Sequence, residues 1–310
     1  MSEISQFPKK YEDLVRIAQQ SMNEKNFFHA KQLLEQAYEI DSSFETVQLL
    51  VLCLLELGKE NEALALAKEN EQEFLEQKDR ATVYFRLLLQ QKSFIEVRKL
   101  IRQGDFDQEF KDTILNQVEH SEQFMLQFES QRVEEICGLV EHLESKSVME
   151  QLHVMTYLES LPYKSFRDTM KKIFINKLLH PLTRAKALEI SVQVAMDETM
   201  AFCTFDEKKI EVIPKQLVLP EKQLGYLECL KQIERSSDDP SITTGILQEL
   251  SFQSAMAYPT FETLIVEPKW WIEQSLLYYR QLLSETPIEG ITPLFLKKHQ
   301  FVTEKMQEMF

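Results

Sequence analysis

The sequence predicts an all-α fold, in which paired helices stack into an α–α superhelix with one small inserted β-hairpin. Only 6 Gly and 10 Pro interrupt the 310 residues, whereas all-β chains need turn residues every ten or so positions. The long segments between them are rich in Leu, Glu, Gln, Lys and Ala, which favour helix. Near the N-terminus an apolar pattern recurs every 33 to 34 residues, which indicates a repeat array.

The repeat runs over three segments between residues 10 and 104. Each segment has an apolar helical face, a polar turn and a second apolar helical face. The turns fall at Lys25-Asn26, Gly58-Lys59 and Lys92-Ser93. The second helices carry a small residue at equivalent positions, namely Ala30, Ala63 and Val97. Since helices approach closely where small side chains meet large ones, each segment is expected to form an antiparallel helical hairpin.

This layout resembles the tetratricopeptide repeat family, whose repeat of about 34 residues contains two antiparallel helices. The most specific match is FFHAKQLLEQAYEID, residues 27–41. The chain departs from the family where the usual aromatic near the repeat start is replaced by Leu14, Val47 and Ala81. The resemblance covers roughly residues 10–104, about a third of the chain, and residues 1–104 are expected to form the repeat domain. It implies a solenoid that binds partner segments on a concave face.

The remaining residues predict a different helical organisation. Residues 105–131 are expected to form a linking or capping helix, and residues 132–310 a further helical domain. The apolar spacing predicts helices at 132–144, 147–161, 164–179, 182–197, 221–235, 241–256, 268–285 and after Pro293. Helix pairs joined by Pro-containing turns resemble HEAT repeats. The whole layout resembles bacterial tetratricopeptide proteins with a HEAT-like C-terminal half.

One segment changes from helical to alternating periodicity. In FCTFDEKKIEVIP, Cys203 and Phe205 alternate with polar residues, as do Ile210 and Val212 after a polar turn. This pattern predicts a β-hairpin near residues 202–213. Because a lone hairpin is only marginally stable in water, its apolar face is expected to pack on neighbouring helices.

Charge and composition argue against several classes of partner. The net charge is −15, from 50 acidic and 35 basic residues, and such a field repels nucleic acid. The basic pairs Lys171-Lys172 and Lys297-Lys298 are too short to form a nucleic-acid site. The longest apolar run, Leu49–Leu55, is far shorter than the roughly 20 residues that span a bilayer. Four scattered cysteines without a CxxC pair suit a reducing compartment. We therefore expect a cytoplasmic protein without nucleic-acid or membrane partners.

No catalytic, metal or cofactor motif is recognisable. The glycines lie more than a dozen residues apart, which excludes GxGxxG, a phosphate-binding P-loop and GxSxG. There is no HExxH, and the six histidines never pair at helical ligand spacing. Adjacent carboxylates such as Glu134-Glu135 are expected on solvated helix faces. The sequence therefore predicts no catalytic residue, no metal ligand and no cofactor, and a protein that is not an enzyme.

The candidate partner-binding site is the inner face of the first helices of the three hairpins. By the geometry of the resembling family, this face carries amide, apolar and basic side chains: Gln19, Asn23, Gln48, Leu52, Arg86 and Gln90. Amide side chains suit extended peptides because they bond the peptide backbone. The alternative is that the protein's own next helix or a second subunit covers this face.

Two interpretations are open for the aromatic group Trp270, Trp271, Tyr278 and Tyr279. Its side chains either belong to the core or anchor a partner. Trp271 and Tyr278 are seven residues apart on one helix face, which favours core. The expected function is a protein-interaction adaptor or scaffold that binds peptide or helical segments, with a partner that the sequence does not identify. The alternative is a self-associating protein that uses its C-terminal helices, and a third is an enzyme or regulator on a helical scaffold.

Overall fold

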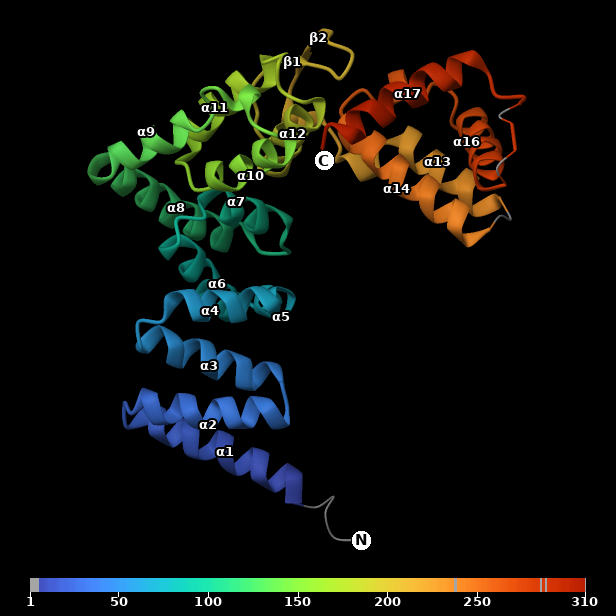
Figure 1. Ribbon diagram of the computed structural model, residues 1–310. Helices are drawn as coiled ribbons and strands as arrows, with labels where there is room; N and C mark the ends of the chain where they lie inside the picture. The colour runs from blue at the N-terminus through green and yellow to red at the C-terminus, as the bar shows by residue number, and fades with distance from the viewer. Residues whose placement is uncertain (1–5, 237–238, 285, 288, 310) are drawn as a thin grey trace. The chain divides into compact units, whose positions relative to one another are not determined.

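A computed structural model describes residues 6–236, 239–284, 286–287 and 289–309. Residues 1–5, 237–238, 285, 288 and 310, which fall in predicted segments, lie outside this description. Within the described part the chain is helical apart from one two-stranded antiparallel sheet, which confirms the predicted fold class (Figure 1). The internal contacts divide the chain into unit 1, Met1–Phe124, and unit 2, Met125–Phe310. The division falls within helix α8 (Gln108–Phe128).

Unit 1 contains three helical hairpins at the positions that the repeat predicts. The first helices are α1 (Gln6–Asn23), α3 (Phe44–Glu56) and α6 (Lys78–Gln90), and their partners are α2 (Phe27–Ile40), α4 (Glu60–Glu69) and α7 (Phe94–Gln103). Each helix contacts its partner, and α2 contacts α3, as α4 contacts α6. Helix α8 (Gln108–Phe128) follows, and Phe106 and Phe110 contact the ring of Phe85.

The three hairpin turns share one backbone conformation. Lys25, Gly58 and Lys92 have φ values of 59°, 68° and 59°, in the left-handed region. In each turn the next residue donates its backbone N–H five residues back, as from Asn26 to the Ser21 carbonyl at 2.8 Å. The left-handed residue itself donates three residues back. These two bonds form a Schellman motif, which satisfies the last carbonyls of the first helix.

The core of unit 1 repeats with the turns. Three sets of equivalent residues, spaced by 33 and then 34 positions, are almost completely buried: Ala18, Val51 and Phe85; Ala30, Ala63 and Val97; Leu34, Ala67 and Ile101. Successive hairpins therefore bury side chains at equivalent positions. In such an array each hairpin is stabilised by its neighbours.

A short helix, α5 (Glu71–Leu75), separates the second and third hairpins and was not predicted. Its Phe74 is fully buried, with ring centroids 5.0 Å from Phe44 and 6.0 Å from Tyr84. Glu71 accepts a 2.7 Å hydrogen bond from the Tyr84 hydroxyl. This short helix thus fills the space between two hairpins and supplies the partner that the buried hydroxyl requires.

Unit 2 contains shorter helices joined by irregular turns. Its α-helices are α9 (Ser130–Gly138), α10 (Val148–Leu158), α11 (Tyr163–Ile175), α12 (Pro181–Gln193), α13 (Leu224–Arg235), α14 (Pro240–Met256), α15 (Phe261–Leu264), α16 (Pro268–Leu283) and α17 (Pro293–Gln307). Single 3₁₀ turns lie at Leu143–Ser145, Pro214–Gln216 and Pro220–Lys222. Helix α14 begins one residue before the predicted range 241–256, since Pro240 is its first residue and Asp239 accepts from the Ser241 N–H at 2.7 Å.

Several helices of unit 2 end earlier than the sequence predicts. The helix predicted at 132–144 ends at Gly138, and His142 turns the chain in the left-handed region. The helix predicted at 182–197 ends at Gln193, because Ala195 adopts φ 53° and forms another Schellman turn. The apolar pattern continues beyond these ends because the residues after them are also buried, as Met196 is.

The predicted β-hairpin is present as β1 (Met200–Cys203) and β2 (Lys209–Val212). Its buried face packs on α11, where Phe202 lies 5.5 Å from Phe174 between ring centroids. The strand begins before the predicted segment, and Phe205 belongs to the turn. Thr204 ends the strand, because its hydroxyl accepts from the Lys208 N–H and bonds Asp206.

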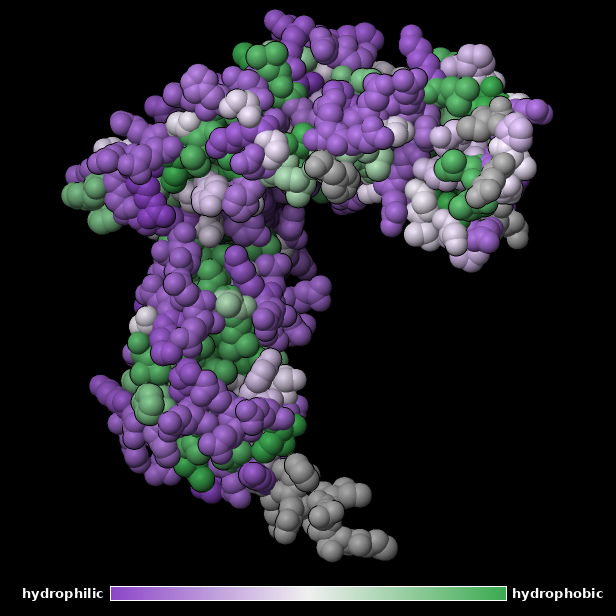
Figure 2. Space-filling view, viewed as in Figure 1, coloured by the Kyte–Doolittle hydropathy of each residue, from purple (hydrophilic) through white to green (hydrophobic). Residues whose placement is uncertain are grey.

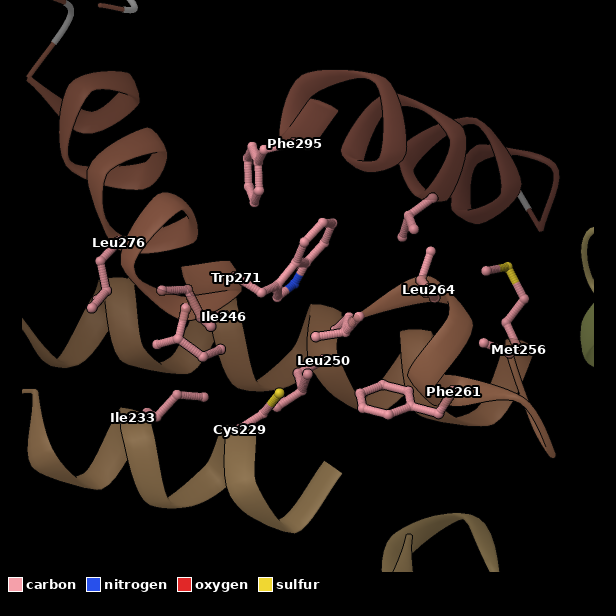
Figure 3. Packing of buried hydrophobic residues seen from close by; sticks show 14 of the residues in the cluster. Cys229, Ile233, Ile246, Leu250, Met256, Phe261, Leu264, Trp271, Leu276 and Phe295 are labelled. Carbon is pink, nitrogen blue, oxygen red and sulfur yellow. The ribbon is translucent and has the colours of Figure 1, made fainter. Parts of the chain in front are cut away.

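The helices α13 to α17 enclose one apolar core, shown in Figure 3. Trp271 and Phe295 point into it, with ring centroids 4.7 Å apart. Trp271 is 1% exposed, which confirms its predicted place in the core. Phe295 and Val302 of α17 are fully buried, so the amphipathic C-terminal stretch docks on its own unit.

Candidate functional site

The six predicted binding residues lie on the first helices of the three hairpins. Two belong to each helix: Gln19 and Asn23 to α1, Gln48 and Leu52 to α3, and Arg86 and Gln90 to α6. Gln19, Asn23, Arg86 and Gln90 are exposed, and Gln48 and Leu52 are half-buried. None of the six therefore belongs to the buried core of unit 1.

Five of these residues occupy two repeating positions. Counted from the left-handed turn residue, Gln19, Leu52 and Arg86 stand at the same place in their hairpins, six residues before it. Asn23 and Gln90 likewise stand two residues before it, and Glu56 fills that place in the second hairpin. Equivalent positions in a stacked array lie in a row. The rows combine amide, apolar, basic and acidic groups.

Most of the polar side chains in these rows have no hydrogen-bond partner among the described residues. Among the described residues, Arg86 has no hydrogen-bond or ion-pair partner, and neither Gln19 nor Asn23 has a side-chain hydrogen bond. Gln90 is the exception, because its Nε2 donates to Glu60 Oε1 at 2.8 Å. Hydrophilic residues cover much of the unit in the view of Figure 2, with hydrophobic ones between them. An exposed row of free donors and acceptors is able to bond a partner's backbone.

Unit 2 holds a buried arginine whose role is structural. Arg184 is 1% exposed, and its guanidinium donates to the backbone carbonyls of Cys203, Thr204, Asn176, Lys177 and Leu179. Burial lowers its pKa. A cavity of about 330 Å³ lies beside it, lined also by His180 and Lys305. Since all three of its nitrogens donate to backbone carbonyls, Arg184 ties the end of α11 to the β-hairpin and offers little to a ligand.

A second cavity in unit 2, of about 380 Å³, lies where α14, α16 and α17 meet. We call it the Glu249 cavity. It is lined by Glu249, Tyr278, Tyr279, Leu282, His299, Thr303, Met306 and Gln307. Glu249 is 7% exposed and its carboxylate accepts from the Tyr279 hydroxyl and from Gln253 Nε2, both at 2.6 Å. His299 Nε2 lies 3.2 Å from the same carboxylate.

The hydrogen bonds of this cluster indicate which of its atoms donate and which accept. Burial, and then the negative charge of Glu249, raise the pKa of Tyr279, so its hydroxyl remains a donor. The carboxylate can only accept, so the contact with His299 Nε2 is favourable when this nitrogen carries the proton. The other ring nitrogen, Nδ1, then faces the Thr303 hydroxyl. The buried Gln253 Oε1 has no hydrogen-bond partner among the described residues.

The order Thr303, His299, Glu249 has the residue types of a nucleophile–base–acid triad, but its geometry does not suit acyl transfer. Thr303 Oγ1 is 3.5 Å from His299 Nδ1 and donates instead to the His299 carbonyl at 3.0 Å. All three residues lie inside helices, where backbone N–H groups are engaged and form no oxyanion hole.

The sequence offered no signal for this cavity. Glu249, Tyr279 and His299 come from three helices and are at least 20 residues apart, so no local motif unites them. The spacing of the aromatic group favours the core, and Tyr278 and Tyr279 are half-buried residues that pack against the core and also line the cavity. A Glu inside an otherwise apolar helix face, as Glu249 is between Ile246 and Leu250, is the one trace that the sequence carries.

Within the described residues no group of three or more His, Cys, Asp or Glu side chains is placed to hold a metal ion. No helix in the described part of the chain is long and apolar enough to cross a membrane. No protein-family model matches the chain, and no curated protein or solved structure is significantly similar to it.

Proposed function

We propose that the protein is an interaction scaffold, and that the rows containing Gln19, Leu52, Arg86 and their neighbours bind extended or helical segments of a partner protein. Unit 1 would then act as a tetratricopeptide-like array in the cytoplasm, as the four free cysteines also favour. The observation that carries the proposal is the repetition of exposed polar groups at equivalent positions of the stacked hairpins, in all three at Asn23, Glu56 and Gln90 and in two at Gln19 and Arg86.

The chemistry of the rows favours a peptide over a smaller ligand. Exposed amides at Gln19, Asn23 and Gln90 offer both a donor and an acceptor, which match a peptide's backbone groups. Leu52 adds a half-buried apolar contact between them. Arg86 adds a positive charge without an internal partner, so a segment with a carboxylate near Arg86 is favoured.

The test is selection of peptides from a random display library on the full-length protein, followed by measurement of their dissociation constants. Combined Leu52→Glu and Arg86→Glu substitution should weaken the selected peptides at least tenfold, because it replaces an apolar contact and a cation with two anions. Circular dichroism and thermal melting should be unchanged. Binding that is unaffected in this double variant would refute the proposed surface.

A matched control comes from the second helix of a hairpin. Lys68→Glu on α4 makes the same change of charge as Arg86→Glu at an exposed site outside the rows. Peptide affinity should stay within about twofold in this variant. A milder pair, Gln19→Ala with Arg86→Ala, covers the case in which Leu52→Glu lowers the helical content.

Self-association through the C-terminal helices is the second candidate, favoured by exposed leucines. Leu294 and Leu296 on α17, and Leu282 and Leu283 at the end of α16, are each more than one-third exposed. Removing α17 would also remove Phe295 and Val302 from the core. The test is therefore light scattering of full-length protein and of Leu283→Glu with Leu294→Glu. A monomer for the unaltered protein at micromolar concentration excludes this candidate.

A further inference from the structure

We propose that the Glu249 cavity is a binding site for a fully alkylated ammonium group, that is, a cation whose nitrogen carries methyl groups and no N–H. The proposal concerns a cavity in unit 2 and does not depend on the peptide surface of unit 1. It follows from three features of the cavity, namely its inclined aromatic walls, its single carboxylate and the small number of free acceptor sites on that carboxylate.

The aromatic walls of the cavity are inclined to one another. The rings of Tyr278 and Tyr279 are perpendicular, with centroids 5.7 Å apart. His299 is inclined by 50° to Tyr278 and by 75° to Tyr279, with centroids at 4.5 and 6.4 Å. Rings set at such angles present faces and edges from different directions. A cation within about 6 Å of a ring centroid is attracted by the negative face of the ring.

The charges around the cavity select a cation over an anion. Among the described lining residues Glu249 is the one carboxylate, and none is Lys or Arg. An anion would meet Glu249 and the tyrosine faces without a fixed positive partner. Most of the remaining wall is apolar, from Leu282 and Met306, so the carboxylate acts from within a poorly hydrated surface, where charge interactions are stronger.

The hydrogen bonds of Glu249 distinguish between kinds of cation. Its carboxylate accepts hydrogen bonds from Tyr279, Gln253 and the His299 ring. These three bonds use three of its roughly four lone-pair sites. A primary ammonium has three N–H donors and would lose water without finding enough acceptors here. An alkylated ammonium has no donors to satisfy. Its methyl groups can lie against Leu282, Met306 and the tyrosine rings while its charge faces Glu249.

The volume of about 380 Å³ falls in the range of small-molecule sites. It suits a trimethylammonium group with a short chain attached. Such a group occurs both in free choline-type molecules and on trimethylated lysine side chains. The chemistry seen by the cavity is the same in the two cases, so the experiment uses a probe of each kind.

The test measures binding to the full-length protein by saturation-transfer and chemical-shift NMR of the ligand methyl protons. Choline should bind, with its methyl resonance moved upfield by the ring currents. Its neutral isostere 3,3-dimethyl-1-butanol should bind at least tenfold more weakly. It lacks the positive charge that is attracted by the aromatic rings and by the Glu249 carboxylate. Equal binding of the two molecules, or no choline binding up to 50 mM (about the limit of a useful titration), overturns the proposal.

Trimethyllysine and unmodified lysine, both with blocked termini, form the second pair of probes. Trimethyllysine should bind more tightly than lysine, since lysine brings unsatisfied donors. Tighter binding of trimethyllysine than of choline assigns the natural source to a modified protein, and the reverse order assigns it to a small molecule. Preference for unmodified lysine would overturn the argument from the carboxylate's occupied lone pairs.

Two variants locate the site. Tyr278→Leu should reduce choline affinity about tenfold through loss of one ring face. Glu249→Gln should reduce choline affinity and leave the weak binding of the neutral isostere unchanged. The matched control is Tyr157→Leu, which removes an exposed tyrosine that also stands beside a histidine, His153, with ring centroids at 5.1 Å. Choline binding that survives Tyr278→Leu but not Tyr157→Leu would place the site elsewhere.

Discussion

The two units differ most in what they bury. Among the described residues, unit 1 buries three polar or charged side chains, Ser21, Thr46 and Glu122, whereas unit 2 buries thirteen. The repeated hairpins meet through Ala, Val, Leu and Phe at equivalent positions. In unit 2 the irregular turns leave backbone carbonyls and N–H groups inside, and side chains such as Arg184 and Gln151 satisfy them.

This difference separates two ways of building a binding surface. A repeat whose core is hydrocarbon is free to vary its exposed positions, and unit 1 carries its free polar groups outside. Unit 2 places polar groups within the core, where Arg184 and Glu249 are each held by several hydrogen-bond partners. Substitutions should therefore be costly in unit 2 and tolerated on the surface of unit 1.

The largest effect is expected from the same substitution in the two units. Arg184→Met leaves the carbonyls of Cys203 and Leu179 buried without donors and the Thr204 carbonyl with the Glu207 N–H as its remaining N–H donor, and should destabilise unit 2 by about 4 kcal/mol or more. Arg86→Met removes an exposed side chain without a partner and should change stability by less than about 0.5 kcal/mol. Chemical denaturation followed by circular dichroism measures both. Equal losses in the two variants would contradict the comparison.

The next effect is a dependence of unit 2 stability on pH. Burial lowers the pKa of His180, although Glu308 acts in the opposite direction. A lowered pKa means that the unfolded chain binds a proton more readily than the folded one. Stability is thus complete above the unfolded value of about 6.5 and falls as pH decreases toward the folded value, with a slope of at most about 1.4 kcal/mol per pH unit.

The variant His180→Asn isolates this contribution. His180 Nδ1 accepts the Leu182 N–H at the start of α12, and Asn keeps an acceptor for that bond without titrating in this range. The variant should lose part of the decrease in unfolding free energy between pH 7 and pH 5 (about the range in which histidine titrates). Parallel pH profiles for the two proteins would show that His180 is not the group responsible.

The sequence predicted the elements of unit 1 well because each signal was local and repeated. The turns at Lys25, Gly58 and Lys92 could be read directly, since a polar break between two apolar faces occurred three times at one spacing. Helix ends in unit 2 were predicted less well. The chain turns at His142 and Ala195 without Gly, while buried residues continue the apolar pattern beyond the helix.

The candidate sites divide in the same way. The rows of unit 1 could be predicted because a repeat fixes which positions are equivalent, so one helix predicts the next. The Glu249 cavity depends on α14, α16 and α17 meeting in space, and the tertiary contact of Glu249 with His299 spans 50 positions. Periodicity assigns a residue to a helix face but does not say which other face it meets.

A smaller effect tests the common turn of unit 1. Gly58 has φ +68°, and a Cβ added there would meet no heavy atom within 4 Å. Gly58→Ala should therefore cost only the strain of a left-handed conformation, about 1 kcal/mol. Thermal unfolding of the variant measures it. A loss above about 2 kcal/mol would indicate that the glycine is required for close packing.

The smallest effect is expected from the reverse exchange at the equivalent position. Lys25 holds φ 59° with an exposed side chain, so Lys25→Gly relieves backbone strain while it adds conformational freedom to the unfolded chain. These terms are each roughly 1 kcal/mol and opposite in sign, so the net change should stay within about 0.5 kcal/mol. Hydrogen exchange at the Asn26 amide, which bonds the Ser21 carbonyl at 2.8 Å, follows the turn itself. Strong loss of protection there would mean that the lysine side chain, rather than the shared Schellman geometry, maintains the hairpin.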